Sequence, residues 1–261
     1  MALPGSAGGR PNEAPLSADV QVRVLRRISL ATLTLLALVV LLATCAPRAI
    51  TSLAAAALPG CRYDVQLPAE RMPLVALTID DAPDPAGTPA ILDTLRAYGA
   101  RATFFVITDQ IPDARLVMAR IAEEGHEIGN HFTTDRASIA LDSASFERDL
   151  EASGSTLHQY GSSKWARPGS GWYSPRMVRA MKRSGYQCAL GTVYPLDGTL
   201  AWPWLSSLYI LAHVRSGGVI VLHDRGNRAS RTARVLGEVL PALRARGYEV
   251  VTLSQLASAG R

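Results

Sequence analysis

The sequence predicts an α/β fold in which parallel strands alternate with helices, and two observations lead to this prediction. From Leu74 onward, short apolar runs with the length of strands alternate with longer stretches of helical periodicity. Glycines follow most of the helical stretches closely, as residues that end helices do. The alternation fits a barrel and a doubly wound sheet equally well, and it predicts one domain over residues 74–256.

The expected elements follow one another in a regular order along this domain. The strands are Leu74–Ile79, Ala102–Ile107, Glu127–Gly129, Lys164–Arg167, Gln187–Val193, Val219–Leu222 and Glu249–Leu253. The helices are Pro89–Tyr98, Ala114–Glu124, Ala144–Gln159, Pro175–Arg183, Leu205–Val214 and Arg231–Arg246. No phosphate-binding glycine loop follows the first strand, which argues against a nucleotide-binding fold.

An apolar segment precedes the domain. Residues 28–46 carry no charge, and as a helix they span about 28 Å, enough for the core of a bilayer. Arginines on the amino-terminal side predict a cytoplasmic N-terminus and a domain outside the cell membrane. We therefore expect a disordered cytoplasmic tail (1–27), a single-pass transmembrane anchor (28–46) and a linker (47–73). A cleaved signal peptide, which leaves the domain secreted, is the alternative.

The bulk composition narrows the class of protein. With 48% hydrophobic residues, 261 residues are enough to bury one sizeable core. The net charge is only +5, and no Lys/Arg run interleaves with aromatic residues, so we expect no nucleic-acid partner. Three cysteines do not make a disulfide scaffold. Because Cys45 lies in the apolar segment, Cys61 and Cys188 are the only possible soluble pair, and we expect them to be unpaired thiols.

Polar residues stand at the carboxyl ends of five expected strands, where parallel β/α folds place their chemistry. They are Asp80 and Asp81, then Asn130, His131 and Asp135, then Arg167, then Asp197, and finally His223 and Asp224. We expect these side chains to converge in space, which residues of unrelated surface loops would not do.

Two adjacent aspartates after a buried strand repel each other, and a bound cation relieves that repulsion. Arg167 ends a strand and is placed to meet Asp80. His223 is the best single candidate for proton transfer. His126 enters its strand at the opposite end, about 16 Å from His131, so we assign it no role.

The motifs "TIDD", "GNHFTTD", "RPGSG" and "VLHD", in this order and spacing, resemble those of the polysaccharide deacetylase family (carbohydrate esterase family 4). The resemblance covers about Leu74 to Leu256. It implies a distorted (β/α)7 barrel. It also implies metal-dependent hydrolysis of N-acetyl groups on chitin-like or peptidoglycan-like polysaccharides.

The resemblance also implies a role for each site residue. Asp80 matches the catalytic base, Arg167 the arginine that orients it, His223 the general acid, and Asp197 the carboxylate that tunes this acid. Asp81 and His131 match two ligands of a divalent cation (Zn, Co or Mn), and Asp135 stands where the family has a second histidine ligand. For the substrate, the Ser170 N–H matches an oxyanion donor and Val221 lines the acetyl-methyl pocket. Trp172 and Tyr173 either stack on a sugar ring or pack in the core.

Three alternatives remain at this point. The first is a non-catalytic carbohydrate-binding protein on the same barrel, since the third ligand and a tryptophan that usually neighbours Asp197 are changed. The second is an O-acetyl esterase or another metal-assisted amidase, because the same water, base and acid serve those reactions. The third concerns Arg225, Arg228, Arg231 and Arg234, which either attract an anionic polymer or form a solvated helix face.

Asp135 makes the predicted ligand set harder than one with two histidines, which favours Mn²⁺, Co²⁺ or Mg²⁺ over zinc. It also leaves bound water less acidic. We therefore expect Asp135→His to strengthen zinc binding and to raise turnover. Metal affinity and rate, measured on the variant and the parent, check this. Unchanged zinc affinity and rate would show that ligand hardness does not govern the site.

Overall fold

The computed structural model describes residues 46–162, 164–195, Asp197 and 202–260, together with Thr32 and Thr34. The expected tail (1–27) and nearly all of the expected membrane segment (28–46) therefore lie outside the described residues. Within the described ranges, no helix has both the length and the apolarity to cross a bilayer. Ala46–Arg261 groups into one compact unit.

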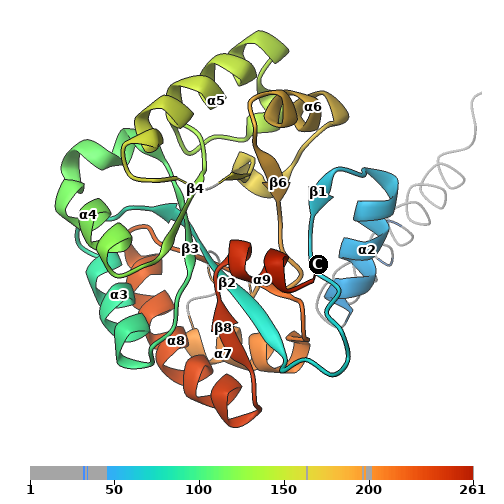
Figure 1. Ribbon diagram of the computed structural model, residues 1–261, viewed down its shortest axis with the longest axis vertical. Coiled ribbons are helices and arrows are strands. Elements are labelled where there is room, and N and C mark those ends of the chain that lie inside the picture. The colour runs from blue at the N-terminus through green and yellow to red at the C-terminus, as the bar shows by residue number, and fades with distance from the viewer. Residues whose placement is uncertain are drawn as a thin grey trace, which may run out of the picture. The chain divides into compact units, whose positions relative to one another are not determined.

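An all-parallel sheet of eight strands forms the centre of this unit (Figure 1). The strands are β1 Cys61–Arg62, β2 Leu74–Ala82, β3 Thr103–Val106, β4 Glu127–Asn130, β5 Trp165–Ala166, β6 Gln187–Ala189, β7 Val219–His223 and β8 Glu249–Val251. They pair in the order β1-β6-β5-β4-β3-β2-β7, and β8 pairs with the beginning of β2. This confirms the predicted α/β class with a parallel sheet, and all seven expected strands are present.

Among the described residues, an isolated bridge joins the segment after β6 to β7, at the far end of this path. Val193, which follows β6, pairs in parallel with Ile220 of β7. The Val193 N–H donates to the Val219 carbonyl, and the Val221 N–H donates to the Val193 carbonyl. The strands from β6 through β2 to β7 consequently close into a ring, so the alternation of strands and helices corresponds to a barrel-like arrangement rather than to an open doubly wound sheet.

β2 shows how the sequence separates the inside of the ring from the outside. Its side chains alternate between the two faces, as they do in any strand. Val75, Leu77 and Ile79 pack outward in the core formed with the helices. Ala76 packs inward, and Thr78 also faces the interior, where its hydroxyl meets the guanidinium of Arg167. All nine residues of β2 are buried, which explains why the strand begins with an unbroken apolar run, Leu74–Leu77.

Helices surround the ring of strands, and the last of them lies across one end of the ring (Figure 1). They are α2 Pro47–Ala57, α3 Thr88–Ala97, α4 Arg115–Glu123, α5 Ser143–His158, α6 Pro175–Arg183, α7 Pro203–His213, α8 Asn227–Ala245 and α9 Leu253–Ala259. Six of them, α3 to α8, match the expected helices to within a few residues. The Asp142 carboxylate caps α5 by accepting from the Ser145 N–H, as side chains of this type do at helix starts.

α9 was not expected, and it closes the amino-terminal end of the ring. A capping box formed by Thr252 and Gln255 starts this helix. Leu253 and Leu256 are buried in a cluster that includes Leu74, the first residue of β2, and side chains from the interior of the ring. The opposite end, where the carboxyl ends of the strands lie, holds the predicted site.

The expectation of unpaired thiols at Cys61 and Cys188 is wrong. The two residues are paired in the register of β1 and β6, their Cα atoms lie 4.5 Å apart, and their sulfurs form a disulfide. The segment expected as a linker, 47–73, is partly structured, since it contains α2 and β1. Cys61 and Cys188 were the only possible soluble pair, but a strand of two residues carries no periodicity that would place Cys61 beside Cys188.

Leu256 is fully buried between α9 and the strands, so its truncation leaves a cavity. We expect Leu256→Ala to lower the free energy of unfolding by about 2–5 kcal/mol, as large-to-small core substitutions do. Leu208, which is 59% exposed on α7, provides a matched control. Urea denaturation of both variants measures the difference. Equal loss in Leu208→Ala would contradict the role given to α9.

Candidate active site

The carboxyl ends of the central strands bring the predicted site residues together. Asp80 of β2 pairs in register with His223 of β7. His131 follows β4 directly, and Arg167 follows β5. Asp80, His131 and Arg167 are each at most 6% exposed. The predicted convergence of these side chains at one end of the strands is therefore present in the structure.

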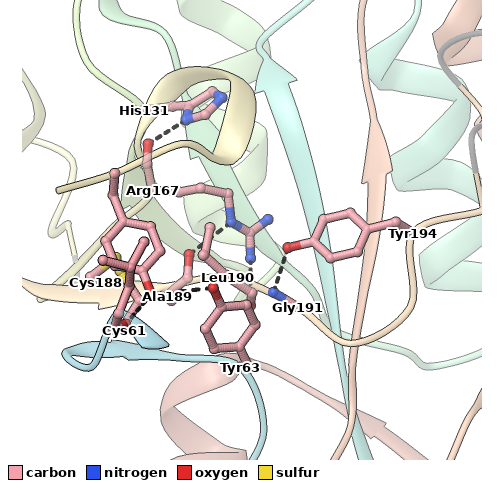
Figure 2. Close-up of a disulfide and its surroundings, with 11 residues drawn as sticks. Cys61, Tyr63, His131, Arg167, Cys188, Ala189, Leu190, Gly191 and Tyr194 are labelled. Carbon is pink, nitrogen blue, oxygen red and sulfur yellow. Dashed lines mark hydrogen bonds between the residues drawn. A yellow bond between two sulfur atoms is a disulfide. The ribbon is translucent and has the colours of Figure 1, made fainter. Parts of the chain in front are cut away.

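Arg167 lies inside the ring and holds Asp80. Its Nη1 donates to Asp80 Oδ1 at 2.5 Å and to the Thr78 hydroxyl at 2.8 Å. Nε and Nη2 donate to the carbonyls of Ala189 and Leu190, at 3.0 and 3.3 Å (Figure 2). The guanidinium carbon also lies 4.0 Å from the ring centre of Phe105, a cation–π contact. With this set of partners the buried cation is well compensated, and the Asp80 carboxylate is fixed in one place.

Asp81 and His131 form the second pair of the site. His131 Nε2 lies 3.6 Å from Asp81 Oδ1. Its other nitrogen, Nδ1, lies 2.6 Å from the carbonyl oxygen of Arg167 (Figure 2). A carbonyl only accepts, so Nδ1 carries a hydrogen, and Nε2 faces the Asp81 carboxylate. Metal-binding histidines are oriented in this way, and the pair fits two ligands of a divalent cation.

The charges in this pair perturb each other. Burial raises the pKa of Asp81, but His131, His223 and Arg228 together lower it below its ordinary value. Burial lowers the pKa of His131, yet the adjacent Asp81 carboxylate and the charge of Asp80 raise it above its ordinary value. Each partner therefore stabilises the charged form of the other, as opposite charges do at short range.

Backbone strain is concentrated at the same place. Three non-glycine residues in the described ranges have a left-handed backbone: Asp81 (φ 64°), Phe132 (φ 69°) and Ser170 (φ 63°). The first is a predicted ligand, the second follows His131, and the third lies in the short 3-10 turn η3 (Gly169–Gly171) after Arg167. Strained conformations of this kind persist where the surrounding structure fixes them, and they cluster at active sites.

His223 is held by Asp197 at the edge of the site. Asp197 Oδ1 lies 2.9 Å from His223 Nδ1, and Oδ2 accepts from the His223 backbone N–H at 2.8 Å. Asp197 is 2% exposed, whereas the His223 side chain is 28% exposed. Burial lowers the pKa of His223, but Asp197 and the more distant Asp80 and Asp81 raise it to about 9. The imidazole is therefore protonated at neutral pH.

Asp135 does not join Asp81 and His131. It lies on an exposed loop, and its Oδ2 pairs with Arg225 Nη1 at 2.5 Å. Among the described residues, no group of three or more His, Cys, Asp or Glu side chains is arranged to hold a metal ion. In this structure an arginine of the loop after β7 engages the residue at the third predicted position.

Comparison with known proteins identifies the family to which this chain belongs. The family model described as Polysaccharide deacetylase matches residues 69–189. A peptidoglycan-N-acetylglucosamine deacetylase of Bacillus cereus is 33% identical over 191 residues, which are 70% of this chain and 87% of the relative. The chain belongs to the polysaccharide deacetylase family. The resemblance drawn from the motifs is thereby confirmed.

Other deacetylases agree with this assignment. A chitooligosaccharide deacetylase of Rhizobium leguminosarum bv. trifolii is 31% identical over 198 residues, which cover 69% of this chain and 90% of the relative. The structure of peptidoglycan deacetylase PdaC from Bacillus subtilis superimposes with a TM-score of 0.67 at 27% identity, covering 72% of this chain and 92% of PdaC. The Bc1960 peptidoglycan N-acetylglucosamine deacetylase gives a TM-score of 0.70 at 25% identity, covering 75% and 92%.

The four residues expected near the substrate lie in different surroundings in this member of the family. Trp172 is 69% exposed, so its ring is open to a ligand. Tyr173 is buried, and its hydroxyl reaches Tyr63, which corresponds to core packing rather than stacking on a sugar. Val221 is buried in β7 against Gly191. Ser170 is exposed on η3.

Several residues that shape this deacetylase site were not assigned from the sequence. Thr78 and Phe105 surround Arg167, and the signal available for Thr78 was its position two residues before Asp80 in the same strand. The larger omission concerns Arg225 and Arg228. Both contact predicted ligands, since Arg228 Nη1 lies 3.1 Å from Asp81 Oδ2. The solvated-face interpretation is therefore wrong for these two arginines.

The pair of His223 and Asp197 predicts a titration. We expect a pKa of about 9 for His223 by NMR, and a lower value in Asp197→Asn, because the carboxylate charge is removed. Because the pKa of His223 is raised, its protonated form stabilises the folded state at pH values below the ordinary histidine pKa. This contribution is lost as the pH rises through about 9. His126, whose pKa burial lowers to about 4, serves as an internal control that the substitution leaves unchanged. An unshifted His223 in Asp197→Asn would contradict the pairing.

Proposed function

We propose that this protein is a metal-dependent hydrolase that removes N-acetyl groups from an amino-sugar polymer of the peptidoglycan or chitin type. The observation that carries the proposal is the juxtaposition of two pairs at one end of the strands: Asp80 with Arg167, and Asp81 with His131. A binding protein has no need of a buried arginine that fixes a carboxylate beside two ligand-type side chains. The names of the relatives, which act on peptidoglycan N-acetylglucosamine and chitooligosaccharide, support this class of substrate.

Asp81 and His131 would hold the divalent cation, which supplies a Lewis acid for the acetamide carbonyl and lowers the pKa of water. Asp80 is the base: its position is set by Arg167, and it removes a proton from the attacking water. His223 is the general acid, and it is protonated because Asp197 and the other carboxylates raise its pKa to about 9. It gives its proton to the nitrogen as the C–N bond breaks. The products are acetate and the free amine.

The proposed location is the outer side of the cell membrane. The apolar segment 28–46, with arginines before it, supports an anchor with the domain outside. The disulfide between Cys61 and Cys188 supports the same side, since such bonds persist in oxidising compartments and are rare in the cytosol.

Trp172, exposed beside the Arg167 block, is available for stacking on a sugar ring.

A second candidate function is carbohydrate binding without hydrolysis. It is favoured by one observation, the pairing of Asp135 with Arg225 instead of with the other two ligands. The two functions predict different results with the same ligand. Binding of N-acetylglucosamine oligomers without acetate release, whichever divalent cation is added, would support the second.

The hydrolase predicts a large effect at Asp80. We expect the purified full chain to release acetate from N-acetylglucosamine oligomers, and we expect Asp80→Asn to reduce the rate about 10²–10⁴-fold, the usual contribution of a general base. Chelation of divalent cations should also abolish release. Asp113→Asn, an exposed position, is the matched control and should retain the parental rate. Full activity in Asp80→Asn would exclude the proposed base.

A further inference from the structure

The start of α8, which follows β7, brings a positive charge directly onto a predicted metal ligand. Arg228 Nη1 lies 3.1 Å from Asp81 Oδ2, while Asp81 Oδ1 faces His131. Both oxygens of the carboxylate are therefore engaged. The Asp81 side chain is 6% exposed, and that of Arg228 is 39% exposed, so the guanidinium comes to the carboxylate from the solvent side.

A second arginine, in the loop between β7 and α8, behaves in the same way. Arg225 holds Asp135, the residue at the position of the third ligand. This loop is fixed independently of the ion pairs, because the Gly226 N–H donates to Asp84 Oδ2 at 2.8 Å. The other oxygen of Asp84 accepts from the N–H groups of Ala86 and Gly87. The loop and the start of α8 thus present two guanidinium groups to two predicted ligands from a fixed backbone.

From this geometry we propose that Arg228 is a built-in competitor of the divalent cation for Asp81, and that it sets the affinity of the site for metal. The proposal rests on the proposed function, because it uses the same two ligands. A cation held by Asp81 and His131 would need the oxygens of the Asp81 carboxylate as ligands. A guanidinium at hydrogen-bond distance from the same carboxylate repels that cation and occupies one of the oxygens it needs.

Binding of the cation is therefore an exchange. Asp81 gives up the guanidinium and accepts the metal, and Arg228, already partly exposed, turns toward solvent. His131 keeps its orientation during this exchange, because its Nδ1 stays bonded to the Arg167 carbonyl. The competition lowers the observed affinity for every divalent cation, so it acts on metal binding as a whole and not on the choice between metals.

The test is a titration with Mn²⁺ of the purified full chain, which is kept in detergent. Electron paramagnetic resonance measures the concentration of free Mn²⁺. We expect Arg228→Gln to bind Mn²⁺ about five-fold or more tightly than the parent, the effect of losing one partly exposed ion pair together with its charge. Arg228→Lys keeps the charge and should stay close to the parent. Arg234→Gln, exposed on the same helix, is the matched control. Asp81→Asn should abolish the binding.

Each outcome decides the inference. Tighter binding in Arg228→Gln but not in Arg234→Gln supports it, and melting curves without metal show that the variants are folded. Equal or weaker binding in Arg228→Gln overturns it. Acetate release in parallel separates the two proposals: release with unchanged Mn²⁺ affinity rejects the competition and leaves the hydrolase. Neither release nor binding in any variant rejects both.

Discussion

The structure depends on a guanidinium buried at the centre of the ring of strands. An isolated cation is very costly to bury, and the cost is offset only when its hydrogen-bond donors find acceptors with good geometry. The partners of Arg167 come from β2, from the end of β6 and from the residue after it, and an aromatic face from β3 covers the group. One side chain thus fixes the relative positions of three strands. The position of Asp80, and with it the geometry of the site, follows from that requirement.

Charges elsewhere at this end of the ring are also paired. His223 is bonded to Asp197, Asp81 contacts both His131 and Arg228, and Asp135 is bonded to Arg225. Arg225 lies in the short loop that follows the strand carrying His223, and Arg228 lies at the start of α8. The stretch from His223 to Arg228 therefore carries an imidazole and also neutralises two carboxylates, so the electrostatics of these side chains are linked through one short part of the chain.

Much of this could be predicted from the sequence where local pattern decides the structure. The continuous apolar run before Asp80 specifies a strand buried on both faces, and the polar residues after each strand then meet at one edge. Asp135 shows where such reasoning fails. Its spacing from His131 suggests a ligand, but its partner is Arg225, ninety residues away in the chain, and a pairing between exposed loops leaves no periodic signal. The same is true of β1, whose two residues are recognisable as a strand only beside β6.

The disulfide has a mechanical consequence. β1 is held to the sheet by few hydrogen bonds, and a strand of two residues would separate from the sheet under a small force. Because Cys61 is covalently joined to Cys188, a force applied through the amino-terminal segment passes directly into β6. For the tethered hydrolase proposed above, the bond would let the domain withstand such a force without unfolding at this end. The next residues of the chain, Ala189 and Leu190, hold the buried guanidinium, so the point that takes the force adjoins the residues that fix Arg167.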